Sequence, residues 1–277
     1  MSKGPGLFAD IGKKAKDLLT KDYNSDQKFS VSTYSEAGVA LTSTAVKRVG
    51  GLSAGDIGAQ YKYKNALVDV KVDTDSNIST TFTITDIIPS TKTIASFKVP
   101  DYNGGKLEVQ YFHDHASFTT AVALNQSPAI DFSSTIGTPT IAFGAEAGYD
   151  TTSGNFTKYT AGFSVTQPVS VASIILCDKG DGVKASYVHY VDLLKRSAGV
   201  MEITRKFSTN ENTFTVGGQY AIDPLTVVKA KLNNHGNLGA LLQHEVIPKS
   251  MLTISGEIDT KSLDKHPKFG LAIALKP

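Results

Sequence analysis

His113-Asp114-His115 is the one dense cluster of histidine and carboxylate side chains in the sequence. Two histidines two positions apart share one face of a strand, and imidazole nitrogens are common ligands of zinc. The triplet, however, falls between two strand-like runs, residues 107–112 and 116–125, where the pattern favours a polar hairpin turn. We therefore predict a turn at this point and no metal site.

Motifs for other kinds of chemistry are missing from the sequence. It holds no Gly-x-Ser-x-Gly elbow, no Gly-x-x-x-x-Gly-Lys phosphate loop and no carboxylate pair suited to acid–base catalysis. One stretch loosely resembles a phosphate loop but precedes a strand pattern, which favours bends in a curved sheet: Gly50, Gly51, Gly55 and Gly58. Cys177 ends an apolar run, so we expect it to be inert and either buried or exposed to lipid. We predict no catalytic residue, no cofactor and no enzyme.

Lysines are the remaining side chains that could act on a solute. Lys229 and Lys231 alternate with apolar residues, so both should point to the polar face of one strand. Lys13, Lys14 and Lys16 cluster near the N-terminus. Rings of basic side chains around a water-filled passage favour anions and phosphates. The alternative for each single lysine is that it is simply solvated.

The charge balance argues against a dedicated nucleic-acid partner. The 277 residues include 28 Lys and Arg against 26 Asp and Glu, which gives a formal net charge of +2. Arg48, Arg196 and Arg205 are the only arginines. Sites that recognise phosphates or bases in a bidentate manner prefer the planar guanidinium, so such a site is not expected.

Cysteine count and hydropathy narrow the class of protein further. A single cysteine excludes a disulfide framework within the chain and a cysteine-based zinc site. No apolar run approaches the ~20 residues that a membrane-spanning helix needs; the nearest run, residues 171–177, is too short. Helical membrane proteins are thereby excluded. Membrane barrels are not, because only alternate residues of their strands face lipid.

Residues 1–25 are predicted to form an N-terminal segment with one amphipathic helix at about residues 7–20. Apolar residues at helical spacing make one stripe: Leu7, Phe8, Ile11, Ala15, Leu18 and Leu19. The charges among them exclude a secretory signal peptide, and the acidic ones disfavour a mitochondrial transit peptide. Two interpretations remain open: a helix packed on a soluble core, or a helix that lies against a wall or a membrane surface.

Residues 26–277 are predicted to form one continuous β unit. Apolar and small polar residues alternate strictly in many runs, for example in residues 117–124, 141–147 and 252–259. Turn residues separate about nineteen such runs, at about 13 residues per run with its turn. This length fits a tilted membrane-spanning strand of ~9–11 residues with a tight turn. Strands of soluble sandwiches are usually shorter, about 5–6 residues.

The composition of the polar face indicates which face meets lipid. That face is made mostly of Ser, Thr, Gly and Ala, and charged residues are 19% of the chain, below the ~25% typical of soluble domains. Small polar side chains leave room for water in a lumen. We therefore predict an all-β fold, a single transmembrane β-barrel with apolar residues outward and the helix in or against the pore. The alternative is a soluble barrel with the apolar face inward.

A stretch in the C-terminal third of the chain resembles the signature of the voltage-dependent anion channels, the porins of the mitochondrial outer membrane. The matching positions are Tyr220, Asp223, Pro224, Lys231, Asn233, Asn234 and Gly239. Ala9-Asp10-Ile11-Gly12-Lys13 is similar to the pore helix of that family. The pattern Lys268-x-Gly270-x-x-Ile273-x-Leu275 resembles its signal for outer-membrane insertion. The resemblance covers the whole chain, and its lysine-rich, arginine-poor form indicates a plant member.

The resemblance implies a barrel of nineteen strands, a number known for this family rather than one worked out from the spacing. An odd number of strands requires that the first and last pair in parallel. It also implies a voltage-dependent, weakly anion-selective channel of the mitochondrial outer membrane for ions and small metabolites such as ATP, ADP, phosphate and organic anions. Lumenal lysines would contact these anions and nucleotides: Lys13, Lys16, Lys21, Lys229 and Lys231. Membrane lipids are implied partners, and a homo-oligomer and cytosolic docking proteins remain open.

Two features depart from animal members of the family. Those members follow the helix with closely spaced glycines, whereas this chain has Asp22-Tyr23-Asn24-Ser25-Asp26, so a swinging-helix gate should not be assumed. Animal members also carry a lipid-facing Glu on an early strand, where this chain has Val68, Val70 and Val72 on the apolar face. Hexokinase binding linked to that Glu is therefore not expected. Two rival functions remain, a related protein-import barrel and a soluble ligand-binding barrel.

Overall fold

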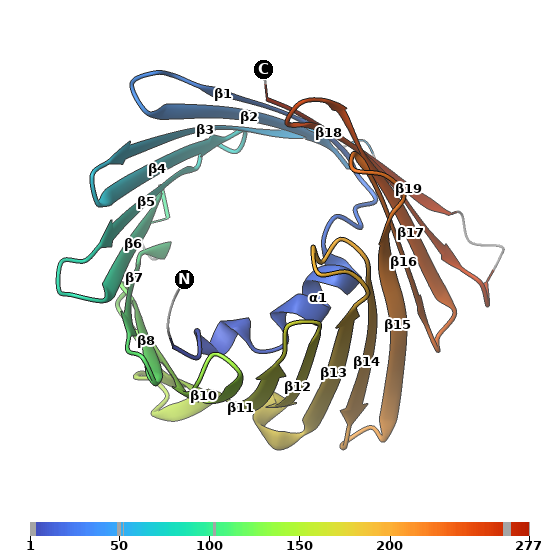
Figure 1. The fold of residues 1–277 in the computed structure, drawn as a ribbon. Helices are drawn as coiled ribbons and strands as arrows, with labels where there is room; N and C mark the ends of the chain where they lie inside the picture. Colours follow the sequence, from blue (N-terminus) through green and yellow to red (C-terminus); the bar gives the residue numbers. More distant parts are fainter. Residues whose placement is uncertain (1–3, 49–50, 52, 102–103, 263–266, 277) are drawn as a thin grey trace.

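A computed structural model describes residues 4–48, 51, 53–101, 104–262 and 267–276. In this part of the chain the strands form one closed sheet that encircles an open centre (Figure 1). Gly50, one of the glycines noted above, lies outside the described residues, as do residues 1–3 and 277 at the ends of the two predicted segments. Among the described residues, no helix is long and apolar enough to cross a membrane.

The described residues form nineteen strands. The first ten are β1 (Gln27–Tyr34), β2 (Val39–Lys47), β3 (Ser53–Tyr63), β4 (Ala66–Asp73), β5 (Ile78–Thr85), β6 (Thr91–Val99), β7 (Lys106–Phe112), β8 (Ala116–Ala123), β9 (Ala129–Gly137) and β10 (Ile141–Asp150). The others are β11 (Asn155–Thr166), β12 (Ser170–Cys177), β13 (Gly182–Tyr190), β14 (Ala198–Lys206), β15 (Glu211–Ala221), β16 (Thr226–Asn233), β17 (Asn237–Ile247), β18 (Ser250–Asp259) and β19 (Lys268–Leu275).

One parallel pair of strands closes the ring. Each strand pairs antiparallel with its neighbours in the sequence, and β1 also pairs in parallel with β19, from Gln27 opposite Leu271 to Val31 opposite Leu275. Antiparallel pairing reverses direction at every step, so an odd number of strands leaves the first and last pointing the same way. The predicted fold, including its parallel closure, is confirmed.

Strand register carries the alternation of the sequence around the whole ring. In β15, Phe214, Val216 and Tyr220 point outward and are exposed, whereas Thr215 and Gly217 point into the lumen. A side chain exposed on the outer wall of a barrel faces lipid, so apolar residues are stable there. This arrangement overturns the soluble-barrel alternative, in which the large apolar side chains would fill the interior.

The N-terminal helical segment is shorter and less regular than predicted. A 3₁₀ turn, η1 (Phe8–Asp10), precedes the helix α1 (Lys13–Thr20), and the two are separated at Ile11 and Gly12. Gly12 has a φ of 75°, in the left-handed region that glycine adopts without steric cost. The continuous helix predicted for residues 7–20 is therefore broken at this glycine, which lets the two parts follow the curved wall.

The helix lies inside the ring and packs against β12, β13, β14 and β15 (Figure 1). The apolar stripe predicted from the sequence makes this contact: Ala15 and Leu19 are buried against Val171, Val188 and Val200. Because these three valines come from the lumenal face of their strands, the contact also defines which face of every other strand is lumenal. Of the two interpretations left open for the helix, the structure supports the second: the helix lies against the wall of the barrel.

Three local predictions can be compared with the structure. His113-Asp114-His115 forms the hairpin turn between β7 and β8, as predicted, and the amide of His115 donates to Nδ1 of His113 at 3.3 Å. Gly55 and Gly58 lie within β3 rather than before a helix. Cys177 was expected to be buried or exposed to lipid, which is wrong: register places it on the lumenal face at the end of β12, where it is half-buried.

Candidate pore and its lysines

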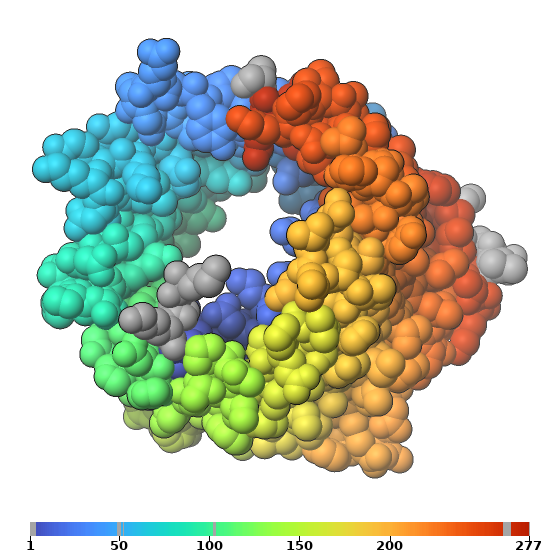
Figure 2. Space-filling model, viewed as in Figure 1, coloured from blue at the N-terminus to red at the C-terminus, as the bar shows by residue number. Residues whose placement is uncertain are grey.

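An open passage runs through the ring, and the N-terminal segment lies along one side of it (Figure 2). Two hydrogen bonds hold the ends of this segment to opposite parts of the wall. Ser117 Oγ in β8 donates to the carbonyl oxygen of Gly6, and Ser255 Oγ in β18 donates to that of Asn24. The segment therefore follows the wall instead of blocking the passage.

The three lysines proposed on or just after the helix lie on its solvated side. Lys13, Lys16 and Lys21 are all exposed in the lumen, and Lys13 Nζ is 3.6 Å from Asp10 Oδ1. Lys14 differs, because it is half-buried and the positive charge of Lys195 is near; burial first, and Lys195 second, lower its pKa. The exposed three leave their charges available to solutes in the passage.

The two lysines of β16 do not project freely into the lumen. Lys229 is only 6% exposed, and its Nζ lies 3.7 Å from Asp22 Oδ2. Lys231 Nζ lies 4.3 Å from the centre of the Tyr23 ring, a cation–π distance. Both lysines thus contact the linker between α1 and β1. Sequence reasoning missed these contacts, because their partners lie at the other end of the chain.

The signature residues stabilise two turns, and Gly239 leaves the space that Lys231 and Tyr23 of the linker occupy. Asp223 Oδ1 accepts the amide of Leu225 at 2.7 Å beside Pro224, and hydrogen bonds from Thr226 and Leu225 hold the pKa of Asp223 below its usual value. Asn233 Oδ1 accepts the amide of Asn237 at 2.9 Å. Further signature positions and their places are Asn234, which bonds Phe214 and Asn212; Tyr220, on the outer face; and Gly239, where a Cβ would lie 2.8 Å from Lys231.

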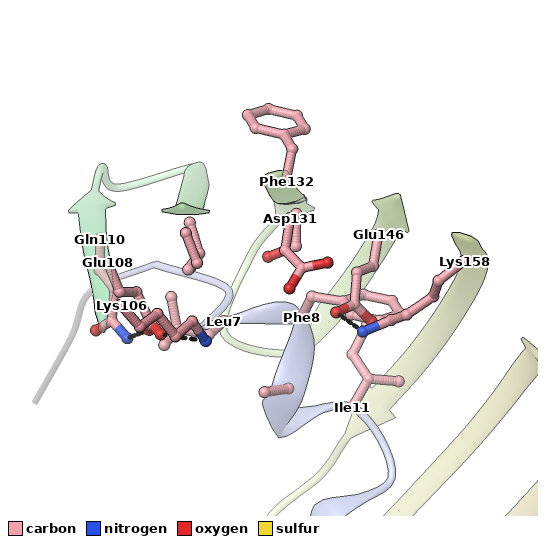
Figure 3. A pocket seen from close by; sticks show the side chains of 14 residues that line it. Leu7, Phe8, Ile11, Lys106, Glu108, Gln110, Asp131, Phe132, Glu146 and Lys158 are labelled. Atoms are coloured by element: carbon pink, nitrogen blue, oxygen red, sulfur yellow. Dashed lines mark hydrogen bonds and ion pairs between the residues drawn. The ribbon is translucent and has the colours of Figure 1, made fainter. Parts of the chain in front are cut away.

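A cavity of about 330 Å³ lies between η1 and the lumenal faces of β7–β11 (Figure 3). Two ion pairs stand in its wall. Lys106 Nζ is 3.3 Å from Glu108 Oε2, and Lys158 pairs with Glu146. Asp131 lies between the two pairs, while the neighbouring Phe132 points away from the cavity. Across the described residues, His, Cys, Asp and Glu form no group of three that could hold a metal ion.

Comparison with known families is decisive for the class of protein. The model of the family described as eukaryotic porin matches residues 4–270. The chain belongs to the eukaryotic porin family. This porin is 72% identical to mitochondrial outer membrane protein porin 2 of Arabidopsis thaliana, over 277 residues and the whole of both chains. It is 64% identical to mitochondrial outer membrane protein porin 5 of Oryza sativa subsp. japonica, over 99% of both chains.

A third plant relative is also a mitochondrial outer membrane porin. The mitochondrial outer membrane protein porin of 34 kDa from Solanum tuberosum is 54% identical over the whole of both chains. The resemblance to plant mitochondrial porins seen in the sequence is therefore confirmed. This porin is a channel of the mitochondrial outer membrane through which ions and metabolites pass, and it is not an enzyme.

The residues of the predicted insertion signal all lie on β19 of this porin. Register places Lys268 and Gly270 on the lumenal face, and Ile273 and Leu275 on the face toward lipid. At Gly270 an added Cβ would clash with the carbonyl oxygen of Asn24, so the linker crosses the last strand here. The close approach of the linker therefore explains why a glycine stands at position 270. A role of Gly270 in membrane insertion stays a prediction.

The cavity residues of this porin were missed in the sequence. Alternation in β7–β11 could have placed Glu108, Asp131 and Glu146 on the polar face. It could not show that η1 covers them, because η1 belongs to a segment separated from these strands by the first six strands of the barrel.

Proposed function

We propose that this porin is a voltage-dependent, weakly anion-selective channel for ATP, ADP, phosphate and organic anions. The observation that supports the selectivity is the exposure of Lys13, Lys16 and Lys21 along one side of an open lumen. Fixed positive charges in a water-filled passage raise the local concentration of anions. Acidic side chains also face the lumen, and the formal net charge is only +2, so the preference should be weak.

The five proposed lysines should contribute unequally to anion selectivity. Lys13, Lys16 and Lys21 are solvated and should dominate the contact with anions. Lys229 is paired with Asp22 and Lys231 sits on Tyr23, so we propose a smaller effect on selectivity for these two. Voltage dependence is proposed because charged groups of the N-terminal segment lie within the transmembrane field, where displacement of a charge is coupled to potential.

Two further parts of the proposal concern partners. A homo-oligomer and cytosolic docking proteins remain predictions of the family resemblance. The import-barrel alternative has no observation in its favour, because the relatives named above are porins.

Single-channel current across a salt gradient in a planar bilayer tests the selectivity. We expect a reversal potential that indicates anion preference, and in Lys13→Glu/Lys16→Glu a fall of at least about twofold in the ratio of anion to cation permeability. Lys276→Glu is the control for a Lys-to-Glu change as such, because it makes half the charge change of the double variant at the exposed C-terminal end of the chain. A double variant whose reversal potential equals that of the wild type would overturn the lysine assignment.

A further inference from the structure

The cavity beside η1 differs in character from the lysine-bearing side of the lumen. Its floor is apolar and comes from the N-terminal segment, with Leu7, Phe8 and Ile11 in contact with the space. Its wall is charged and comes from β7, β9, β10 and β11. A volume of about 330 Å³ is that of about ten water molecules, or of one organic molecule of about ten heavy atoms.

The charges in the wall leave one negative charge uncompensated. Three carboxylates (Glu108, Asp131 and Glu146) face two ammonium groups, those of Lys106 and Lys158. Both lysines are already paired with glutamates. An incoming anion would have to break one of these pairs, whereas an incoming cation would not.

Asp131 is the carboxylate that remains available. Within the part of the chain that the structure describes, no hydrogen bond or ion pair reaches its carboxylate, which points into the cavity (Figure 3). Its Oδ1 lies over the backbone of β10, where a Cβ on Gly148 would come within 2.7 Å of it. Gly148 therefore leaves the space that this carboxylate occupies.

A second acceptor lines the same space. Gln110 is only 7% exposed, and its Nε2 donates to Glu108 Oε1 at 2.6 Å. This bond uses the amide nitrogen, and among the described residues nothing donates to the amide oxygen. The cavity therefore offers two acceptors, a carboxylate and an amide, above an apolar floor.

From this geometry we infer that the cavity binds organic monocations: a primary ammonium group at Asp131, with an apolar body of about ten heavy atoms against Leu7, Phe8 and Ile11. A single ammonium group matches the single uncompensated charge. The site goes beyond the proposed anion preference and does not depend on it, because none of Lys13, Lys16 and Lys21 lines the cavity.

Tyramine is a suitable probe, because it has ten heavy atoms, a primary ammonium and an aromatic body. Its binding to the detergent-solubilised full chain is followed by ligand-observed NMR, with 4-ethylphenol as the analogue that lacks the amine. We expect saturable binding of tyramine that is weakened at least tenfold in Asp131→Asn. Asp69→Asn is the matched control, a lumenal aspartate on β4 that accepts Gln60 Nε2 at 3.3 Å, and it should bind tyramine within twofold of the wild type.

A measurement on the unaltered chain guards against a variant that fails to fold. Intermolecular NOEs should connect the tyramine ring with the Leu7 methyl groups and the Phe8 ring. NOEs that avoid both residues, equal affinity in Asp131→Asn, or equally tight binding of 4-ethylphenol would each overturn the site. Binding is read without ion flow, so its failure is distinguishable from a failure of the proposed anion selectivity.

Discussion

Among the described glycines, Gly270 is the one at which another stretch of backbone comes closest to the place of a Cβ. The linker carbonyl of Asn24 accepts from Ser255 Oγ, and a side chain at position 270 would occupy the place of that carbonyl. Glycine has no Cβ and allows such an approach. The residue therefore holds the start of the barrel against its last strand.

Gly270→Ala should destabilise the barrel by about 1–3 kcal/mol, because the linker must move and its hydrogen bond from Ser255 is lost. The measurement is chemical unfolding of the refolded protein in detergent. Gly199→Ala is the control, since nothing lies within 4 Å of a Cβ added there, and its effect should stay within about 0.5 kcal/mol. Equal destabilisation by the two variants would contradict this role of Gly270.

Residue types and alternation predicted which lysines face the lumen, but not what each one contacts. Lys229 and Lys231 are on the polar face, as their spacing indicates. Their partners Asp22 and Tyr23 come from the linker, and only the course of the folded chain brings them together. Periodicity reports the face of a strand, whereas contacts depend on three-dimensional packing.

At the scale of elements, α1 is held by an apolar contact rather than by its own stability. A helix of eight residues is too short to be stable alone in water. Its apolar face, with Leu19 at 4% exposure, packs on β12–β15. The spacing of apolar residues predicted this face correctly. It did not predict the break at Gly12, because the same apolar spacing runs on both sides of this glycine and gives no sign that its φ is positive.

Leu19→Ala should loosen the helix without opening the barrel. Removal of a buried leucine side chain costs about 2 kcal/mol or more, which is about 30-fold in a local opening equilibrium. Amide hydrogen exchange of residues 16–21 should accelerate by that factor, while exchange in β12–β15 stays nearly unchanged. Lys16→Ala, on the exposed side of the same helix, is the control. If exchange accelerated equally in both variants, the apolar contact would not be what holds the helix.

The whole molecule depends on one parallel pair of strands for closure. The β1–β19 ladder spans Gln27 to Val31, and Phe29 in its centre lies opposite Ile273 on one side and Ala45 on the other. Alternation gave about nineteen strands, and the odd number follows from the family resemblance. The hydropathy pattern could not show which residue of β1 pairs with which residue of β19, because every strand has the same alternation.

Ser30→Pro should lower the yield of closed barrel severalfold, because the Leu271 amide bonds the Asp26 carbonyl and the alternation along β1 then turns the amide of Ser30, but not that of Phe29, toward β19. Proline cannot donate to the ladder, and a carbonyl left unpaired in hydrocarbon costs several kcal/mol. The yield is measured as the protease-resistant fraction after refolding in detergent. Tyr34→Pro, in the same strand but beyond the residues paired with β19, is the control and should reduce the yield less. Equal yields from the two variants would show that the parallel ladder is not the critical closure.

The crossing of the linker over β19 has a consequence for the order of assembly. Asn24 lies against Gly270 at the same place where β1 and β19 join, so the wall cannot be completed there until the last strand has been synthesised. The N-terminal segment is synthesised first, yet it can take its final position only after β19 has been made. We expect the N-terminal segment to be enclosed in the same event that joins the two ends of the barrel, as the final step of biogenesis.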